Sequence, residues 1–449
     1  MKIRFVTLGC KLNFAESSAI GKALLQRGHT RAKQGEEADI CVINTCSVTD
    51  NADHKDRQTI HRIHRQNPNA IIIVTGCYAQ LQPEQIAQIE GVDYVLGQNE
   101  KYEVTQLVDD IERLRDSLED ASLQDAASGY SLEAQKIRVA NIREVEEFHR
   151  AYSKDDRTRC FLKVQDGCNY FCTYCTIPYA RGKSRNPAIS DIIKDAQEAI
   201  LQGAKEIILT GVNIGDFGRS TGEAFIDLLK ALDSLEDGVP PTERPTGYSL
   251  EARDYRIRIS SCEPNLLTDE IIDFVAHSRH FAPHFHIPLQ SGSNEVLSIM
   301  KRRYTRELFE ERVKHIKQVM PHAFIGVDCM VGVRGETEEY FNDYVEFIKR
   351  LDVSQLHVFT YSERANTRML ELDLCIVPKA ERQRRSKILH EISEEKTQTF
   401  YASQTGREAI VLWESKKEGD QMAGFTENYV KVYRPYDKEK VNTFEVIRL

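Results

Sequence analysis

The sequence has no long hydrophobic run. No stretch of about eighteen apolar residues occurs, which is the length that a membrane-spanning helix needs. The first ten residues hold only a short apolar stretch, the length of a strand and too short for the core of a secretion signal. We therefore expect a cytoplasmic protein without a membrane segment.

The sequence also has no excess of positive charge. Its 60 Lys and Arg residues face 69 Asp and Glu residues, which gives a formal net charge of -9. An acidic total argues weakly against a nucleic-acid partner, although local basic patches can still contact phosphates. The 11 cysteines are an odd number, and disulfides are rare in the reducing cytoplasm, so cysteine usage favours metal ligation or catalysis.

A length of 449 residues predicts two or three domains. In residues 1–118, β-rich runs alternate with helical segments that begin near Glu16 and Asn51, which is typical of an open parallel sheet covered by helices. The expected strands are 3–8, 40–44, 71–75 and 94–96. Residues 119–153 are charged and poor in large apolar residues, and we expect a linker there.

The remainder predicts two further domains, so the expected fold class is α/β multidomain. Residues 154–384 contain six β-rich runs separated by helical stretches, a pattern typical of a partial (β/α)6 barrel with its chemistry at the carboxyl ends of the strands. These runs are 160–164, 206–210, 257–260, 284–288, 324–331 and 355–360. A charged helix is expected around 379–399. Residues 385–449 predict a small β-barrel with strands at 409–414, 424–430, 432–433 and 443–447.

A six-residue repeat, Gly-Tyr-Ser-Leu-Glu-Ala, occurs at 129–134 and again at 247–252. Both copies lie in irregular, polar surroundings, and two short copies cannot bury a shared core. We expect both to be surface inserts.

Three cysteines in a CxxxCxxC run follow the first strand of the predicted barrel: Cys168, Cys172 and Cys175. A loop there can wrap three thiolates around one 4Fe-4S cluster and leave one iron open. The open iron can chelate S-adenosylmethionine, and electron transfer into the sulfonium then releases a 5'-deoxyadenosyl radical. The alternative is a structural zinc site, which would lack its fourth ligand.

Three other cysteines, Cys10, Cys46 and Cys77, each come shortly after the end of a strand of the first domain. Loops at the carboxyl edge of an open parallel sheet line one crevice, so we expect these thiols to converge on a second, auxiliary 4Fe-4S cluster with an open iron. The alternative is three buried cysteines that pack as small hydrophobic residues.

These motifs resemble the radical-SAM methylthiotransferases. The residues around the first two auxiliary cysteines, 9–13 (Gly-Cys-Lys-Leu-Asn) and 44–49 (Asn-Thr-Cys-Ser-Val-Thr), are similar to the members that act on N6-threonylcarbamoyladenosine at position 37 of tRNA. The resemblance implies that the radical removes hydrogen from carbon 2 of the adenine, the auxiliary cluster carries the sulfur, and a second S-adenosylmethionine gives the methyl group. Both clusters are then expected to face one cavity.

Three alternatives remain at this point. The enzyme class could act on isopentenyladenosine in tRNA or on a ribosomal protein, although the motifs of those members differ. A third reading is a non-catalytic iron-sulfur protein that binds RNA. The sequence departs from the usual family pattern at Val333 and Arg334, where Phe-Pro is common, and again at 361–367.

The resemblance also implies contacts to S-adenosylmethionine. The candidates follow successive barrel strands or the cysteine motif, and each could instead be a turn, a helix cap or a packing residue. They are Tyr174, Thr210, Gly211, Asn213, Ser260, Glu263, Gln290 and Ser291.

Candidate RNA contacts lie in two basic segments, a helix after Cys46 and the stretch after the radical-SAM cysteines. They are Lys55, Arg57, Arg62, Arg65, Arg181, Lys183 and Arg185. The last domain resembles the RNA-binding TRAM domain, although its lysines and arginines could simply solvate the surface. The expected partners are the tRNA anticodon stem-loop, an external electron donor and a sulfur source, with the protein acting as a monomer.

Overall fold

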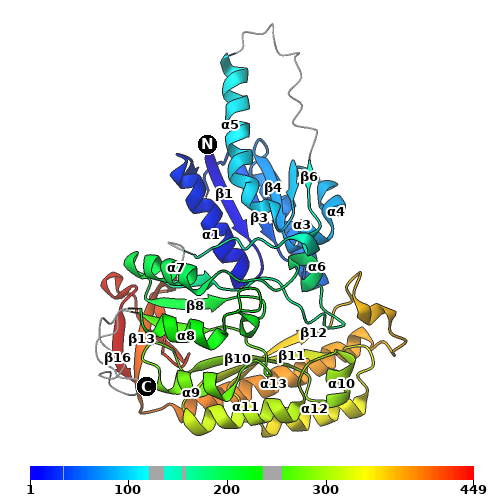
Figure 1. The fold of residues 1–449 in the computed structure, drawn as a ribbon, viewed down its shortest axis with the longest axis vertical. Coiled ribbons are helices and arrows are strands. Elements are labelled where there is room, and N and C mark those ends of the chain that lie inside the picture. Colours follow the sequence, from blue (N-terminus) through cyan, green and yellow to red (C-terminus); the bar gives the residue numbers. More distant parts are fainter. Residues whose placement is uncertain (34, 121–135, 154–157, 236–254) are drawn as a thin grey trace. The chain divides into compact units, whose positions relative to one another are not determined.

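The computed structural model describes residues 1–33, 35–120, 136–153, 158–235 and 255–449 (Figure 1). The chain divides into two compact units. The first holds Met1–Ser153 and Cys175–Lys183, and the second holds Lys154–Tyr174 and Ser184–Leu449. Both copies of the six-residue repeat lie outside the described residues. No helix in the described ranges has the length and apolarity needed to cross a bilayer.

The first unit is built on a parallel sheet with the strand order β2-β1-β3-β4-β5-β6. The central strands β3 and β4 are apolar along nearly their whole length, as expected for strands covered on both faces. The parallel sheet predicted from the sequence is confirmed, and β2 and β6 are strands that the sequence did not predict. The strands are β1 (Lys2–Thr7), β2 (Thr30–Arg31), β3 (Ile40–Thr45), β4 (Ile71–Gly76), β5 (Tyr94–Leu96) and β6 (Ile137–Arg138).

Helices cover both faces of this sheet because successive strand residues point to opposite sides. Ile40 and Val42 pack with α1 and α5, whereas Cys41 and Ile43 pack with α2, α3 and α4. The helices are α1 (Lys11–Gln26), α2 (Asp50–Gln66), α3 (Cys77–Leu81), α4 (Pro83–Ala87), α5 (Val104–Asp120) and α6 (Ile177–Arg181). The last of these comes from the segment after the CxxxCxxC motif and belongs to the first unit.

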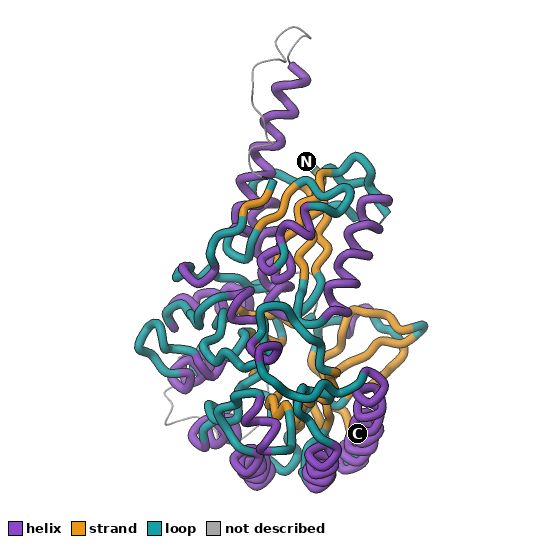
Figure 2. The backbone as a smooth tube through the Cα atoms, turned by 90° about the vertical axis from the view of Figure 1, so that its right-hand side faces the viewer, coloured by secondary structure: helices purple, strands orange, loops and turns teal. Residues whose placement is uncertain are grey.

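The second unit contains six parallel strands in chain order, arranged as sheets β7-β8-β9 and β10-β11-β12. Isolated parallel bridges join the β9 region to the β10 region. All six strands run in the same direction, so their carboxyl ends share one edge. Figure 2 draws the strands in orange and the helices in purple. They are β7 (Arg159–Lys163), β8 (Glu206–Thr210), β9 (Arg256–Ile259), β10 (His284–Gln290), β11 (Phe324–Val331) and β12 (Gln355–Thr360).

Helices alternate with these strands, as the sequence predicts. Several begin at a Ser or Thr whose side chain accepts the hydrogen bond of a first-turn amide, for example Thr268, Thr305 and Thr337. The helices are α7 (Ile189–Leu201), α8 (Phe225–Asp233), α9 (Asp269–His277), α10 (Asn294–Ile299), α11 (Arg306–Val319), α12 (Glu338–Arg350) and α13 (Lys379–Ser403).

The chain ends in an antiparallel sheet of order β15-β14-β13-β16, with β13 (Glu408–Glu418), β14 (Gln421–Phe425), β15 (Lys431–Pro435) and β16 (Phe444–Arg448). The strand predicted at 424–430 is wrong beyond Phe425. Thr426 N donates to Val430 O, and Tyr429 has a φ of 68°, so the chain turns there. The boundary predicted between residues 384 and 385 falls inside α13.

A buried ion network fixes the antiparallel sheet to the amino ends of β8 and β9. Glu206, the first residue of β8, pairs with Arg256 and Arg258 of β9 at 2.5 and 2.9 Å. Arg256 Nη1 donates to Ile410 O and Arg258 Nη1 donates to Glu427 O. The C-terminal sheet therefore packs at the edge opposite the carboxyl ends of these two strands.

Candidate active site and metal centres

The three auxiliary cysteines all lie at the carboxyl edge of the first sheet. Cys10 is the residue before α1, Cys46 follows β3, and Cys77 is the first residue of α3. Cys10 is exposed, whereas Cys46 and Cys77 are buried. A side chain is excluded at Gly9, since a Cβ there would lie 3.0 Å from Cys46 Sγ.

The auxiliary thiols lie close enough to affect one another electrostatically. Burial, followed by the charges of Cys77 and Cys10, raises the pKa of the Cys46 thiol to about 12. Burial also raises the pKa of Cys77, while the charge of Arg181 lowers it. Buried thiols become thiolates when a metal centre supplies positive charge.

The donor set at the carboxyl edge of the first sheet consists of three cysteines, and thiolates are the ligands of iron-sulfur clusters. Among the residues that the structure describes, no three His, Cys, Asp or Glu side chains are arranged to hold one metal ion.

Asn13 holds two of the cysteine loops together. Its Nδ2 donates hydrogen bonds of 2.9 Å to Leu8 O and to Thr45 O. Its Oδ1 accepts from Cys10 Sγ at 3.8 Å. The side chain is fully buried, so its amide has no competing water. Asn13 belongs to the motif at residues 9–13, and its position three residues after Cys10 is the sequence signal for this role.

A buried ion network extends from Asn13. Arg181 Nη2 donates to Asn13 Oδ1 at 2.6 Å, and Arg181 Nη1 lies 3.1 Å from Glu16 Oε1. Lys101 pairs with the other oxygen of Glu16. All three charged side chains are at most 1% exposed. Two cations therefore share one buried carboxylate close to the thiols. The sequence pattern did not indicate Glu16 or Lys101 as part of the site.

The segment that carries the third radical-SAM cysteine also contacts this region. Cys175 belongs to the first unit, and Ile177 N donates to its Sγ at 3.4 Å. The next residue, Thr176, donates through Oγ1 to Ser47 O at 3.4 Å. Thr176 and Ser47 directly follow Cys175 and Cys46, so one cysteine of each motif lies next to this contact.

The other two radical-SAM cysteines lie in the second unit, in the loop after β7. Burial raises the pKa of Cys168 to about 12 and also raises the pKa of Cys172. Arg302, which the sequence analysis missed, donates to Cys172 Sγ at 3.1 Å. Its other guanidinium nitrogens bond Glu263 and Tyr304. Arg302 comes from the loop after α10, and no local sequence signal connects it with the motif.

The candidate S-adenosylmethionine residues lie along the carboxyl ends of β8, β9 and β10 in the second unit. Gln165 Oε1 accepts from the amides of Val212 and Asn213 at 2.9 Å and orders the turn after Thr210 and Gly211. Ser260 and Ser291 are buried. The Oε1 atom of Gln290 is buried without a hydrogen-bond partner among the described residues, which leaves an acceptor available for a bound molecule.

Glu263 and Tyr174 meet at Arg302. The Arg302 guanidinium pairs with Glu263 and donates to Tyr174 OH at 3.4 Å. Burial raises the pKa of Glu263 although Arg302 opposes this shift. Tyr174 also packs against a buried cluster that includes Val296 and Val333, which is the packing role considered from the sequence.

The two segments that depart from the family pattern bond to each other. Arg334 Nε donates to Glu363 Oε1 at 2.8 Å, and Val333 is buried in the same cluster as Tyr361. The two segments that differ from the family pattern therefore contact each other within the second unit.

The structure corrects two of the predicted RNA contacts. Arg181 is buried against Glu16, and Arg185 is buried with Nη2 3.3 Å from Asp166 Oδ2, so neither guanidinium faces solvent. Glu16 lies 165 residues from Arg181 and Asp166 lies 19 residues from Arg185, so neither partner gave a local signal. Lys183 is exposed.

The RNA contacts predicted on α2 are mostly exposed, unlike Arg181 and Arg185. Lys55, Arg62 and Arg65 are exposed, and within the described ranges they form no ion pair. Arg57 is half-buried and donates to Tyr78 OH at 2.7 Å. In the C-terminal sheet, by contrast, Lys431 pairs with Glu418, while Arg434 and Lys440 pair with Glu445.

Comparison with known proteins identifies relatives of both units. Residues 2–97 match the uncharacterized protein family UPF0004, and residues 162–348 match the radical SAM superfamily. The protein of Bacillus subtilis (strain 168) named threonylcarbamoyladenosine tRNA methylthiotransferase MtaB is 37% identical over 436 residues, covering 96% of this chain and 89% of the relative. The protein of that name from Aquifex aeolicus (strain VF5) is 35% identical over 444 residues, covering 98% of each.

A solved structure shares the fold. The radical S-adenosylmethionine methyltransferase TsrM from Kitasatospora setae, with cobalamin and a 4Fe-4S cluster bound, matches with a TM-score of 0.55 and 15% identity. The match covers 80% of this chain and 74% of that chain. Together with the identity to the curated relatives over nearly their whole length, these findings show that the chain belongs to the MtaB-type radical-SAM methylthiotransferase family.

Proposed function

We propose that the chain converts N6-threonylcarbamoyladenosine in tRNA to its 2-methylthio derivative. The observation that carries this proposal is the 37% identity to a relative of that name over 89% of its length. Relatives named tRNA-2-methylthio-N(6)-dimethylallyladenosine synthase, which stand for the isopentenyladenosine alternative, are less similar, at 28 to 31% identity.

S-adenosylmethionine and iron-sulfur clusters are the cofactors of this family, and when bound they supply the radical, the sulfur and the methyl group. We assign Cys168, Cys172 and Cys175 as ligands of the radical-SAM cluster. The auxiliary cluster is assigned to Cys10, Cys46 and Cys77. In each set three thiolates leave one iron free to bind a further ligand.

The chain's own residues position these groups. Arg302 donates to Cys172 Sγ and fixes the carboxylate of Glu263 in the second unit. Thr210, Gly211 and Asn213 present an ordered turn, and the other proposed S-adenosylmethionine contacts are Tyr174, Ser260, Glu263, Gln290 and Ser291. Asn13 fixes the loops that carry Cys10 and Cys46.

The proposed domain organisation follows the sequence boundaries. Residues 1–118 form the domain of the auxiliary cluster, 119–153 a linker, 154–384 a partial β/α radical-SAM barrel, and 385–449 a TRAM-like RNA-binding barrel. Six parallel strands in chain order and the C-terminal antiparallel sheet support this organisation. We further propose a cytoplasmic monomer that needs an external electron donor and a sulfur source.

The decisive experiment is mass spectrometry of tRNA nucleosides from a deletion strain, with and without a plasmid that encodes this chain. We expect the 2-methylthio-N6-threonylcarbamoyladenosine peak to disappear in the deletion strain and to return with the plasmid. An unchanged peak in the deletion strain rejects the proposal. The isopentenyladenosine peak and the ribosomal proteins of the same cells test the alternative substrates, and 5'-deoxyadenosine formation by the reduced protein tests catalysis itself.

A further inference from the structure

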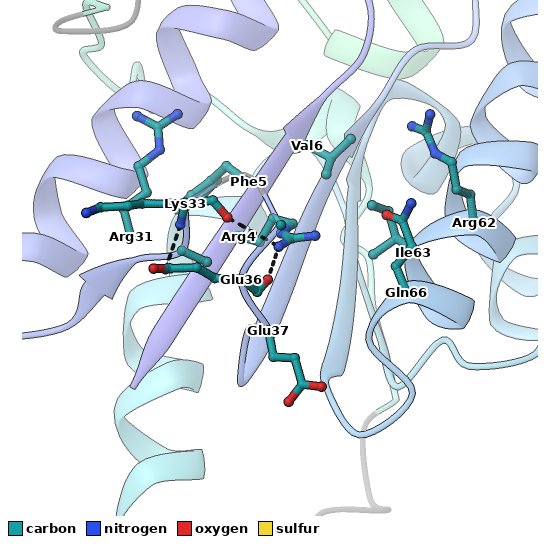
Figure 3. A pocket seen from close by; sticks show the side chains of 12 residues that line it. Arg4, Phe5, Val6, Arg31, Lys33, Glu36, Glu37, Arg62, Ile63 and Gln66 are labelled. Atoms are coloured by element: carbon teal, nitrogen blue, oxygen red, sulfur yellow. Dashed lines mark hydrogen bonds between the residues drawn. The ribbon is translucent and has the colours of Figure 1, made fainter.

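Strand β1 of the first unit has one face that helices cover only in part. On one side of the sheet α1 and α5 pack over it, whereas on the other side α2 packs mainly over β3 and β4, and the half-buried Val6 of β1 packs at the edge of that cluster. The side chains of Arg4 and Val6 therefore line an open hollow of about 1140 Å³. Figure 3 shows these two residues of β1 between Arg31, Lys33 and Glu36 on one side and Arg62 and Gln66 of α2 on the other.

The rim of this hollow is rich in cations. Arg31, Lys33 and Arg62 are exposed, and Arg4 binds the carbonyl oxygens of Lys33 and Glu36, which fixes the loop after β2. Glu37 is exposed as well. The carboxylate of Glu36 accepts from Lys33 N at 3.0 Å and lies 3.8 Å from Lys2 Nζ, so its charge is already balanced within the protein.

A second hollow of about 810 Å³ continues this surface along α2. Arg62 lines both hollows, and the second adds Lys55, His61 and Arg65 against a single carboxylate, Glu90. Leu8, which lies two residues before the exposed Cys10, also lines it. The two hollows form one groove, which we call the β1–α2 groove, and it leads toward the auxiliary cysteines.

The lining favours contact with a phosphate backbone over stacking with bases. Among the described lining residues, Phe5 is the one Phe, Tyr or Trp, and its ring packs against Gly21 of α1 on the opposite face of the sheet. The floor is aliphatic, with Val6 and Ile63. Surfaces that bind single-stranded bases usually offer aromatic platforms, whereas cations alone contact phosphates without reading sequence.

We propose that the β1–α2 groove binds the sugar-phosphate backbone of the substrate RNA and guides it toward Cys10. The inference rests on the proposed function for the identity of the RNA, and on charge complementarity for the binding. In a chain with a net charge of -9, a groove lined by six Lys and Arg residues is a local exception that suits a polyanion.

The test is a double charge reversal, Lys33→Glu with Arg62→Glu, in the full cluster-loaded protein. Binding of unmodified tRNA is measured over a series of salt concentrations. We expect the dissociation constant to rise about tenfold or more and the slope of log K against log salt to fall by about 1.4 to 1.8, because each of the two phosphate contacts contributes about 0.7 to 0.9 to that slope.

A matched control makes the same charge change on α5. Arg113→Glu with Arg115→Glu alters two exposed arginines outside the groove, and we expect its tRNA affinity to stay within about twofold of the unchanged protein. Iron content and melting temperature are measured for every variant. If the double reversal loses iron, the neutral pair Lys33→Gln with Arg62→Gln replaces it, and we expect the slope of log K against log salt to fall by about 1.4 to 1.8.

Equal salt slopes for the groove variant, the control variant and the unchanged protein would overturn the groove proposal, even if the unchanged protein modifies tRNA. A loss of affinity as large in the α5 control as in the groove variant would overturn it too. The proposed function fails separately, if the unchanged protein forms no 2-methylthio nucleoside. Binding is measured directly and does not depend on turnover, so the two failures are distinguishable.

Discussion

Arg181 Nη2 lies 2.6 Å from Asn13 Oδ1, although the two residues are 168 positions apart in the sequence. Asn13 lies in the helix that begins after Cys10, and Arg181 ends the short helix that follows Cys175. This hydrogen bond therefore attaches the segment after one cysteine motif to the scaffold of the other. Both side chains are buried, so the bond forms away from competing water.

Replacing Asn13 tests its role in holding the auxiliary cysteines. Asn13→Asp keeps the shape but removes both hydrogen bonds from Nδ2 and places a carboxylate oxygen against Leu8 O or Thr45 O. We expect iron per protein to fall by about half while 5'-deoxyadenosine formation continues. Iron analysis and that assay check the outcome, with Asn141→Asp, an exposed asparagine of the same unit, as control. Full iron content in Asn13→Asp would contradict the assignment.

Arg181 should act on stability and not on RNA affinity. Arg181→Met removes one of the cations that pair with Glu16, and breaking a buried ion pair costs about 3 kcal/mol. Arg113→Met removes an exposed pair with Asp110 and should cost less than about 1 kcal/mol. Denaturant unfolding measures both variants. A salt slope for tRNA binding that falls by about 1 in Arg181→Met would restore the rejected RNA contact.

Single cysteine variants test the two-cluster assignment. Cys46→Ala and Cys168→Ala should each remove about half of the iron, because each belongs to a separate three-thiolate set. The variants differ in chemistry: Cys168→Ala should abolish 5'-deoxyadenosine formation, whereas Cys46→Ala should retain it. Cys41→Ala, which changes a buried cysteine of β3 within the apolar core, is the control and should keep the full iron content. Loss of all iron from Cys46→Ala alone would mean a single shared centre.

Arg302 should tune the radical-SAM cluster. A hydrogen bond and a positive charge at a ligand sulfur raise the reduction potential of an iron-sulfur centre, and Arg302 supplies both to Cys172. We expect Arg302→Met to lower the midpoint potential and to slow 5'-deoxyadenosine formation, while Arg302→Lys keeps part of the effect. Redox titration followed by electron paramagnetic resonance measures the potential. An unchanged potential in Arg302→Met would show that the contact is only structural.

The Glu206 network predicts an acid-sensitive attachment of the C-terminal sheet. Burial raises the pKa of Glu206, but Arg256 and Arg258 outweigh this effect and hold the net pKa well below the ordinary value of 4.5. The folded state thus binds fewer protons than the unfolded state around pH 4. The stability from this carboxylate is present above its unfolded pKa and falls as pH drops through that value toward the folded pKa.

Glu206→Gln should reproduce that loss at neutral pH. It leaves two buried guanidinium groups without their carboxylate, at a cost of about 3 kcal/mol. Hydrogen exchange should then show faster exchange in β13 and β14, because Arg256 donates to a carbonyl oxygen of each of these strands and Arg258 donates to one in the turn that follows β14. Glu408→Gln, at an exposed residue of β13, is the control. Unchanged exchange in Glu206→Gln would show that apolar packing alone holds the sheet.

The sequence predicted the site best where the signal was local. Cys10, Cys46 and Cys77 each follow a strand, and parallel strands end at one edge of a sheet, so their shared position could be predicted from periodicity. The strand prediction at 424–430 was wrong beyond Phe425 because Thr426 closes a turn with Val430. Residue β-propensity does not predict such a contact.

The arginines show what a local sequence pattern could not predict. Arg181 and Arg185 stand in a basic stretch, and the sequence could not distinguish a solvated cation from one paired with a distant carboxylate. In the structure both arginines are paired, Arg181 with Glu16 and Arg185 with Asp166. The role of Arg302 could not be predicted for the same reason, since it contacts Cys172, which lies 130 residues away in the sequence.

The sequence by itself determined most of the strands, both cysteine motifs and the family, because these depend on local periodicity and spacing. The tertiary structure alone decided that Cys175–Lys183 packs with the first unit, which cations are buried, and that the β1–α2 groove stays open. Each of those depends on which distant side chains come together, since the free energy of burying a charge is set by its partner and not by its neighbours in the chain.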